Sequence, residues 1–453
     1  MAVVAPHRRM LNHPTASSMR DMSISVVGLG KIGLPLAVQC ASMGHAVIGG
    51  DVSAATVKKV NAGLEPFPGE ACLAEKLAAV VEGGLLRATT NTATAVAQSE
   101  AVVVVVPLSV DARGVPDFDG MDSATRDVAS GLKPGTLVSY ETTLPVGTTR
   151  NRFGPMLEEG SGLRLGSDFH LVFSPERVFI GRVFADLARY PKLIGGVDEA
   201  SARRGIAFYS SVLKFDDRDD LPRPNGVWDL GSAEAAEMAK LAETIYRDVN
   251  IGLANQFARF ASANGLDFFQ VIEACNSQPF SHIHRPGIAV GGHCIPIYPH
   301  LYLWNDPEAT VVRAAREANA GMPKYASAQL EAVHGSLSGQ RVAVLGAAYR
   351  GGVKETAGSG VFPLVASLRE RGADVLVHDP MHTEVELRGL GFEPYLVGQP
   401  AEAVVVQADH AEYRNWSSRD VPAVRTVVDG RRALTQGNWD VEAFVVLGQA
   451  VGR

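Results

Sequence analysis

A glycine pattern near the N-terminus constrains the fold of this chain more than any other feature. The short apolar run 23–27 breaks at a glycine, and residues 28–33 (Gly-Leu-Gly-Lys-Ile-Gly) fit the spacing G-x-G-x-x-G. A helical pattern follows from about Leu34 to Met43, and a second β-rich run covers residues 45–48. In such a unit the first glycine permits a tight turn, the second lets the backbone approach a pyrophosphate, and the third lets the helix pack on the sheet. The pattern predicts the start of a doubly wound parallel α/β sheet.

The acidic residue after this unit indicates which dinucleotide to expect. Asp51 ends the second predicted strand. A carboxylate there accepts hydrogen bonds from a ribose diol and repels a 2′-phosphate, so NAD is favoured over NADP. The valine-rich run 101–106 is typical of a strand buried on both faces and ends at Pro107. The cofactor contacts expected here are Gly28, Gly30, Lys31, Ile32, Gly33, Asp51 and Pro107.

A long helical pattern covers the middle of the chain, from about residue 232 to residue 264. It contains no proline and one glycine, Gly252. At about 1.5 Å per residue such a helix exceeds ~40 Å, which suits a spacer between two domains and a dimer surface. An ordinary buried core helix is the alternative.

A second strand–turn–helix signature follows this helix. Residues 341–345 are apolar, Gly346 breaks the run, a helical stretch continues to about Arg371, and residues 373–378 are again β-rich. Alanines follow Gly346, so the glycine pattern is incomplete. This unit is either a degenerate fold without a dinucleotide or, as we prefer, the holder of the nucleotide half of a substrate. The expected fold is therefore α/β, with two Rossmann-like doubly wound domains joined by a long central helix. The expected parts are a disordered tail (1–21), an NAD-binding domain (22–212), a central helical dimerisation and catalytic domain (213–325) and a nucleotide-sugar-binding domain (326–453).

Charge and cysteine usage limit the class of partner. The 453 residues carry a net charge of −7, which gives no basic field for nucleic acid. No apolar run is long enough to cross a bilayer, and the opening segment lacks the apolar stretch of a secretory signal. The four cysteines form no CxxC pair, which argues against a zinc site or a disulfide framework and favours the reducing cytoplasm. No metal is expected.

One of these cysteines lies in a distinctive setting. Residues 291–296 read Gly-Gly-His-Cys-Ile-Pro, which places Cys294 directly after a glycine turn. The glycines Gly291 and Gly292 allow close backbone approach, and nearby N–H groups can favour a thiolate or an oxyanion. An isolated cysteine is more often a small buried hydrophobe.

Six stretches in order show that the chain resembles the UDP-glucose/GDP-mannose dehydrogenase family over its whole length after the tail. They are VVGLGKIGLPLA from Val26, ETTLPVGTT from Glu141, SPERVFIG from Ser174, AEMAKLAETIYRDVNIGLAN from Ala236, GGHCIP from Gly291 and VAVLGAAYRGGVKE from Val342. The resemblance implies NAD and a nucleotide-diphospho-sugar as ligands, a homodimer through the central helix, and a four-electron oxidation at sugar C6 through a thioester on Cys294.

The resemblance also implies roles for other residues. Lys240 would stabilise alkoxide charge and bind substrate, Glu176 would orient or activate water, and Thr143 would hold a water or the cofactor. Thr143 and Glu176 also join the expected cofactor contacts. Arginines match phosphate bidentately, so Arg350, Arg431 and Arg432 could grip the pyrophosphate, unless they are solvated surface residues.

The chain departs from the family pattern at several positions. Thr244 replaces the usual asparagine one turn after the lysine and is expected to take its place in the catalytic set, and Tyr298 replaces the usual aspartate. The family's proline and glycine before GGHC are Ile288 and Ala289, and the stretch 354–359 is altered to KETAGS. A non-catalytic protein that binds NAD and a nucleotide sugar, and a two-electron β-hydroxyacid dehydrogenase, are therefore alternatives. The sugar is expected to be UDP- or dTDP-glucose or a UDP-N-acetylhexosamine, in polysaccharide or glycoside biosynthesis.

Overall fold

The computed structural model describes residues 22–111 and 113–449. The tail expected over residues 1–21 lies outside this part. The described residues form two compact units: residues 22–109 with 117–240, and residues 110–111 and 113–116 with 241–449. The domain boundaries expected after residues 212 and 325 remain predictions. No helix within 22–111 or 113–449 is long and apolar enough to cross a membrane.

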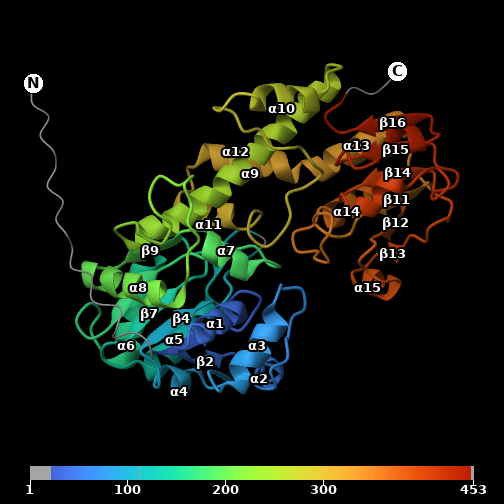
Figure 1. The fold of residues 1–453 in the computed structure, drawn as a ribbon. Coiled ribbons are helices and arrows are strands. Elements are labelled where there is room, and N and C mark those ends of the chain that lie inside the picture. Colours follow the sequence, from blue (N-terminus) through green and yellow to red (C-terminus); the bar gives the residue numbers. More distant parts are fainter. Residues whose placement is uncertain (1–21, 112, 450–453) are drawn as a thin grey trace, which may run out of the picture. The chain divides into compact units, whose positions relative to one another are not determined.

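The first unit is built on an eight-stranded sheet in the order β10-β9-β8-β7-β4-β1-β2-β3 (Figure 1). Its neighbours pair in parallel except β8 and β9, which pair antiparallel. The chain order reverses at β1, so the edge beside β1 and β4 is the topological switch point where ligands bind in such sheets. The strands are β1 Ser23–Val27, β2 Ala46–Gly50, β3 Leu86–Thr89, β4 Ala101–Val104, β7 Leu137–Tyr140, β8 His170–Phe173, β9 Lys192–Gly196 and β10 Val227–Asp229.

Helices cover both faces of this sheet (Figure 1). Apolar side chains of α1, α3, α7 and α8 form one core with the strands, and α4, α5 and α6 contact one another in a second helical layer. The short strands β5 Ser109–Val110 and β6 Pro116–Asp117 form a separate ribbon. The helices are α1 Gly33–Ser42, α2 Ala54–Asn61, α3 Leu73–Glu82, α4 Thr92–Val96, α5 Asp119–Gly131, the π-helix Thr149–Phe153, α6 Gly154–Ser161, α7 Val183–Arg189 and α8 Glu199–Val212.

The second unit contains a six-stranded parallel sheet in the order β13-β12-β11-β14-β15-β16, preceded by helices. Cores lie on both of its faces, one of them with α13 and α14. The strands are β11 Arg341–Leu345, β12 Asp374–His378, β13 Glu393–Pro394, β14 Ala403–Val406, β15 Thr426–Asp429 and β16 Ala443–Val446. The helices are α10 Phe268–Asn276, α11 Tyr298–Asn305, α12 Thr310–Ala320, α13 Met322–His334, α14 Val361–Glu370, α15 Glu384–Gly389 and 3-10 turns at Ala411–Asn415 and Gln436–Asn438.

The predicted α/β class, parallel sheets and long central helix are confirmed. The helix α9 covers Ala233–Ala263, which is 31 residues or about 46 Å at ~1.5 Å per residue. The prediction that a helix starts directly after Gly346 is wrong, because α14 begins only at Val361. Residues 346–360 instead form a loop, since the N–H groups of Ala347 and Ala348 donate to the Asp379 carboxylate rather than to a helix.

Candidate active site

The glycine loop between β1 and α1 has the geometry that each of its glycines was expected to provide. Gly28 has φ +93°, and a Cβ there would lie 2.9 Å from the Val105 carbonyl oxygen. A Cβ on Gly33 would lie 1.8 Å from the Gly28 carbonyl oxygen, so only glycine lets α1 start this close to the strand. A Cβ on Gly30 would meet nothing within 4 Å. The backbone at Gly30 is therefore open to a diphosphate, and the loop fits a dinucleotide.

The acidic residue after β2 ties this loop to the sheet. The Asp51 carboxylate accepts the Leu29 N–H at 2.9 Å and the Ser53 N–H at 2.8 Å. Asp51 is half-buried, so its carboxylate is also reachable from outside. Among the other expected cofactor contacts, Lys31 and Pro107 are exposed and Ile32 is half-buried in the turn before α1.

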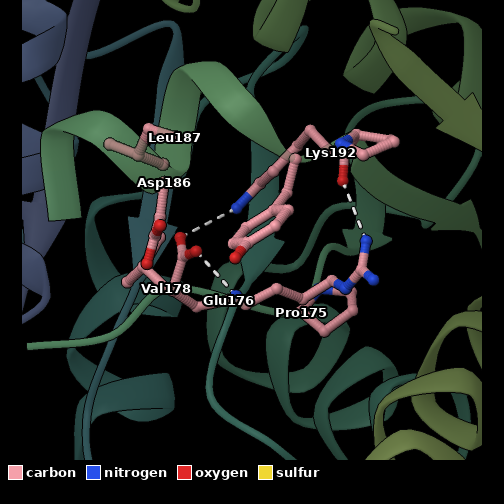
Figure 2. Close-up of a pocket in the computed structure, with 9 residues that line it drawn as sticks. Pro175, Glu176, Val178, Asp186, Leu187 and Lys192 are labelled. Atoms are coloured by element: carbon pink, nitrogen blue, oxygen red, sulfur yellow. Dashed lines mark hydrogen bonds and ion pairs between the residues drawn. The ribbon is translucent and has the colours of Figure 1, made fainter. Parts of the chain in front are cut away.

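A buried ionic cluster lies where β7 and β8 end. The ammonium of Lys192 lies 2.7 Å from the Glu141 carboxylate. It also lies 3.1 Å from the Glu176 carboxylate, a contact that Figure 2 shows. Burial raises the pKa of Glu141 to about 7, although Lys192 opposes this. Glu176 is buried too, but the charge of Lys192 and the hydrogen bonds to its carboxylate outweigh burial and lower its pKa. Glu176 therefore stays ionised at neutral pH.

The predicted Thr143 lies in the segment that follows β7. Its side chain is buried, and the neighbouring Thr142 hydroxyl donates to the Val106 carbonyl oxygen at 2.6 Å, which joins the segments after β7 and β4. The structure thus brings Thr143, Glu176 and the glycine loop to one edge of one sheet, because the carboxyl ends of its parallel strands meet there.

The first turns of α9 carry two more of the predicted residues. Glu237 of α9 accepts the N–H groups of Gly147 and Thr149 at 2.5 Å and 2.9 Å, which fixes the helix to the turn after Thr143. Lys240 is half-buried one turn further on. Thr244 is buried in turn, and its hydroxyl donates to the Leu241 carbonyl oxygen at 3.0 Å.

Cys294 belongs to the second unit and lies just before α11. Its thiol is free and exposed, and its carbonyl oxygen accepts the Tyr298 N–H at 2.9 Å as α11 begins. Gly292, at φ +97°, donates its N–H to the Ala357 carbonyl oxygen at 2.8 Å. A Cβ on Gly291 would lie 2.4 Å from the Tyr349 Cβ. The cysteine segment therefore docks closely on the loop 346–360.

The three predicted phosphate-binding arginines have different surroundings, and the guanidinium of Arg432 lies 4.6 Å from the centre of the Phe269 ring. Arg350 is exposed, and its guanidinium lies 5.7 Å from the centre of the Tyr349 ring. Arg431 donates to the carbonyl oxygens of Gln407 at 3.0 Å and Tyr349 at 3.1 Å, so it fastens the loop 346–360 to the segment after β14. Burial lowers the pKa of Arg431.

The comparisons with known proteins match the chain in three consecutive segments. The NAD-binding domain of one family matches residues 22–213, its central domain matches 234–321, and its UDP-binding domain matches 343–436. A UDP-N-acetyl-D-mannosamine dehydrogenase of Pyrococcus horikoshii is 36% identical over 424 residues, which are 92% of this chain and 96% of that protein. The chain belongs to the UDP-glucose/GDP-mannose dehydrogenase family. NAD is its cofactor, and it is an NAD-dependent nucleotide-sugar oxidoreductase.

Solved structures of the family have the same fold. The structure of the UDP-D-ManNAc dehydrogenase from Pyrococcus horikoshii has a TM-score of 0.83 at 33% identity and covers 94% of this chain and 99% of that chain. A UDP-glucose dehydrogenase from Pyrobaculum islandicum has a TM-score of 0.82 at 26% identity and covers 97% of this chain and 100% of that one.

Three residues of the ionic cluster around Glu176 were missed from the sequence: Lys192, which contacts Glu176, and Glu141 and Tyr209, which lie behind it. Lys192 is the first residue of β9, the strand that runs against β8. Nothing in the sequence marks that strand as antiparallel, so the encounter could not be predicted. Glu141 could have been predicted from the sequence, since it begins the ETTLPVGTT stretch and directly follows a predicted strand.

Proposed function

We propose that the chain oxidises the C6 alcohol of a nucleotide-diphospho-hexose to the carboxylate through a thioester on Cys294. The observation that carries this proposal is the free, exposed thiol of Cys294, held at the start of α11 by a glycine turn that docks on the loop 346–360. Bound NAD supplies a hydride acceptor, and two NAD are consumed in turn for each sugar. Overall, RCH2OH, two NAD+ and water give RCOO−, two NADH and three protons.

The residues of this chain divide the remaining work. The Lys240 ammonium stabilises negative charge on the sugar oxygen as C6 is oxidised. The Cys294 thiolate adds to the aldehyde, which lets the second hydride leave from a tetrahedral carbon and forms the thioester. Glu176 takes a proton from the water that hydrolyses the thioester, with Thr143 beside it. Thr244 contributes a hydroxyl oxygen to the water network, since its proton is donated to Leu241.

For the substrate, we infer a UDP-N-acetylhexosamine, with UDP-glucose and dTDP-glucose as the next candidates. Support comes from the names of the relatives, which are UDP-N-acetyl-D-mannosamine dehydrogenases in Pyrococcus horikoshii and, at 31% identity, in Salmonella typhi. The backbone at Gly291 and Gly292 and the guanidinium of Arg350 are proposed to contact the nucleotide-sugar, with Arg431 fixing the loop that holds them.

The test counts NADH produced per sugar consumed across a panel of UDP- and dTDP-hexoses. Two NADH per sugar are expected, and Cys294→Ser should block acid formation. Cys72→Ser is the matched control, because Cys72 is also free and exposed but lies at the start of α3. One NADH per sugar would reject the four-electron mechanism, and full turnover by Cys294→Ser would remove the covalent step.

A non-catalytic binding protein is the second candidate, favoured by the Thr244 hydroxyl donating to the main chain at the position where the family pattern implies an asparagine. It requires binding of NAD and a UDP-sugar in calorimetry, with no NADH formed from any sugar of the panel.

We also propose a cytoplasmic homodimer through α9. The exposed apolar residues Tyr246, Leu253 and Phe260 are spaced by seven residues, so they lie along one stripe of the helix, with Phe257 beside them. Leu253→Glu combined with Phe260→Glu should give monomers in sedimentation experiments. Val385→Glu, an exposed apolar residue of α15, should leave the mass unchanged.

A further inference from the structure

Lys192 is buried between two carboxylates, and only one of the two lines a pocket. The side chain of Lys192 is 4% exposed, that of Glu141 is 0% exposed and that of Glu176 is 13% exposed. Glu176 and Lys192 border a small pocket, into which the amine of Lys192 points toward Glu176 (Figure 2). Burying three charges is costly, and the fold gains more from apolar side chains of similar volume. The cluster therefore calls for a functional explanation.

The antiparallel strand β9 is what brings Lys192 to this place. In the β8–β9 pair Val172 lies opposite Gly196 and Phe173 lies opposite Gly195. Continuing that register past the end of β8 places Glu176 level with Lys192. Because β9 runs against its neighbour, its first residue reaches the edge where β7 and β8 end and where the cofactor loop lies.

A second set of contacts fixes Lys192. One oxygen of the Glu141 carboxylate accepts from Lys192, and the other accepts the Tyr209 hydroxyl proton at 2.6 Å. The Ser139 hydroxyl lies 2.6 Å from the Tyr209 oxygen and donates to it, because the Tyr209 proton is used on Glu141. Four elements, β7, β8, β9 and α8, thus converge on one ammonium group.

The Glu176 carboxylate is held by fewer groups. One oxygen accepts from Lys192 at 3.1 Å, and the other accepts the Arg177 main-chain N–H at 2.7 Å. Among the side chains that bear on this carboxylate, Lys192 supplies the positive charge and Glu141 a further contact, and the charge of Lys192 is the main influence that lowers the pKa of Glu176 against the effect of burial. The other titratable groups facing the cluster or its pocket are Cys40 on α1, Tyr209 on α8, Glu141, Arg177, Asp186 and Tyr190.

We propose that Lys192, held by Glu141 and Tyr209, is a positioning residue that aims the Glu176 carboxylate and keeps it ionised for release of the acyl group from Cys294. In that step the water oxygen bonds to the acyl carbon, the C–S bond breaks and the sulfur leaves as thiolate. One water proton passes to Glu176, and the other stays on the carboxylic acid until the acid ionises to the carboxylate. This inference rests on the proposed function. It concerns only the hydrolysis step and assigns Lys192 no part in hydride transfer.

The test compares the first turnover with steady-state turnover in the full chain with NAD and the sugar that gives the highest rate. Lys192→Met should keep the NADH burst, because both hydrides leave before hydrolysis. Its steady-state rate should fall at least tenfold. The acid limb of its pH–rate profile should move to higher pH, because Glu176 loses its neighbouring positive charge. Lys192→Arg restores the charge and should recover most of the steady-state rate.

A buried carboxylate pair without its cation could prevent folding, so a charge-balanced variant accompanies this one. Glu141→Gln/Lys192→Met removes one charge of each sign and should show the same burst with slow steady-state turnover. Wild-type kcat with an unmoved pH profile in either folded variant would overturn the role of Lys192. Equal loss of burst and steady-state rate would also overturn it, since that indicates a general structural defect. The proposed function fails separately, by one NADH per sugar in the unaltered chain.

Discussion

Two strand–loop–helix units of this chain begin alike and then differ: the short crossing from β1 to α1 and the long crossing from β11 to α14. Gly28 and Gly346 end their first strands at φ +93° and +99°, and in each case the next N–H donates to an aspartate after the second strand, Asp51 or Asp379. In the first unit α1 begins at Gly33, whereas in the second the loop 346–360 intervenes before α14. The short crossing presents a helix N-terminus to a dinucleotide. The extra residues of the long crossing, the loop 346–360, contact the segment that contains Cys294.

Their aspartates also differ in surroundings. Asp51 is half-buried with two main-chain donors. Asp379 is buried and faces His382 at 2.9 Å and His410 at 3.2 Å as well as three main-chain N–H groups. A carboxylate that already accepts this many hydrogen bonds holds a loop in place and has little capacity to accept more from a ligand. The same residue type therefore keeps a reachable carboxylate in one crossing and serves loop stability in the other.

The largest expected effect is that of Gly33→Ala, a substitution at the start of α1 in the short crossing. Its Cβ would overlap the Gly28 carbonyl oxygen, so α1 must move from the strand at a cost of about 1–3 kcal/mol, and NAD binding should be lost. Denaturant unfolding and NAD titration by fluorescence measure both effects. Gly30→Ala separates them, because its Cβ meets no atom within 4 Å: stability should be kept while NAD affinity falls. Equal destabilisation by both substitutions would contradict the distinct roles of these glycines.

Gly291→Ala tests whether the long crossing holds the cysteine. The new Cβ would lie 2.4 Å from the Tyr349 Cβ and 2.9 Å from the Gly358 carbonyl oxygen, so the segment must shift. A displacement of ~1 Å at a reacting group can cost about 100-fold in rate, and we expect kcat to fall by about 10- to 100-fold. NAD affinity, measured by the same titration, should not change. Wild-type kcat in this variant would show that the docking on loop 346–360 does not position Cys294.

How much of this could be foreseen from the sequence depends on the range of the interactions. The glycine loop, Asp51 and the long helix α9 were predicted, because they rest on spacing within a short stretch of chain. The loop 346–360 was mistaken for helix, because Ala347 and Ala348 favour helix locally while Asp379, distant in sequence, takes their N–H groups. The Lys192 cluster depends on strand direction, which the residues of β9 do not encode locally.

Asp379→Asn should have a smaller, pH-dependent effect on stability. Hydrogen bonds to His382, His410 and main-chain N–H groups hold the pKa of Asp379 below its ordinary value. Its stabilisation is therefore present above about pH 4 and is lost as pH falls below that. At pH 7 the substitution should cost about 1–3 kcal/mol in unfolding free energy, with less difference from the wild type near pH 3.

Asp51→Asn is the counterpart, and it should mainly reduce the preference for NAD over NADP. Equal losses of unfolding free energy in Asp379→Asn and Asp51→Asn would contradict the different roles of the two aspartates.

The smallest expected effect concerns Glu237 and has the opposite sign. Burial raises the pKa of Glu237 to about 7, although three hydrogen bonds from Gly147 and Thr149 oppose it. The folded chain then binds a proton that the unfolded chain releases near pH 4.5, so this group stabilises the fold at low pH and loses that contribution as pH rises toward 7. Glu237→Gln cannot titrate, and its melting temperature should change less between pH 5 and 7 than that of the wild type, by a few degrees at most, about 2–4 °C per kcal/mol for a domain of this size. An unchanged slope would mean that Glu237 stays ionised over that range, held by its three donors rather than protonated by burial. Glu237 and Asp379 would then follow one rule, that buried carboxylates with enough hydrogen-bond donors keep their charge. The difference between these two carboxylates would then lie in the histidines that face Asp379.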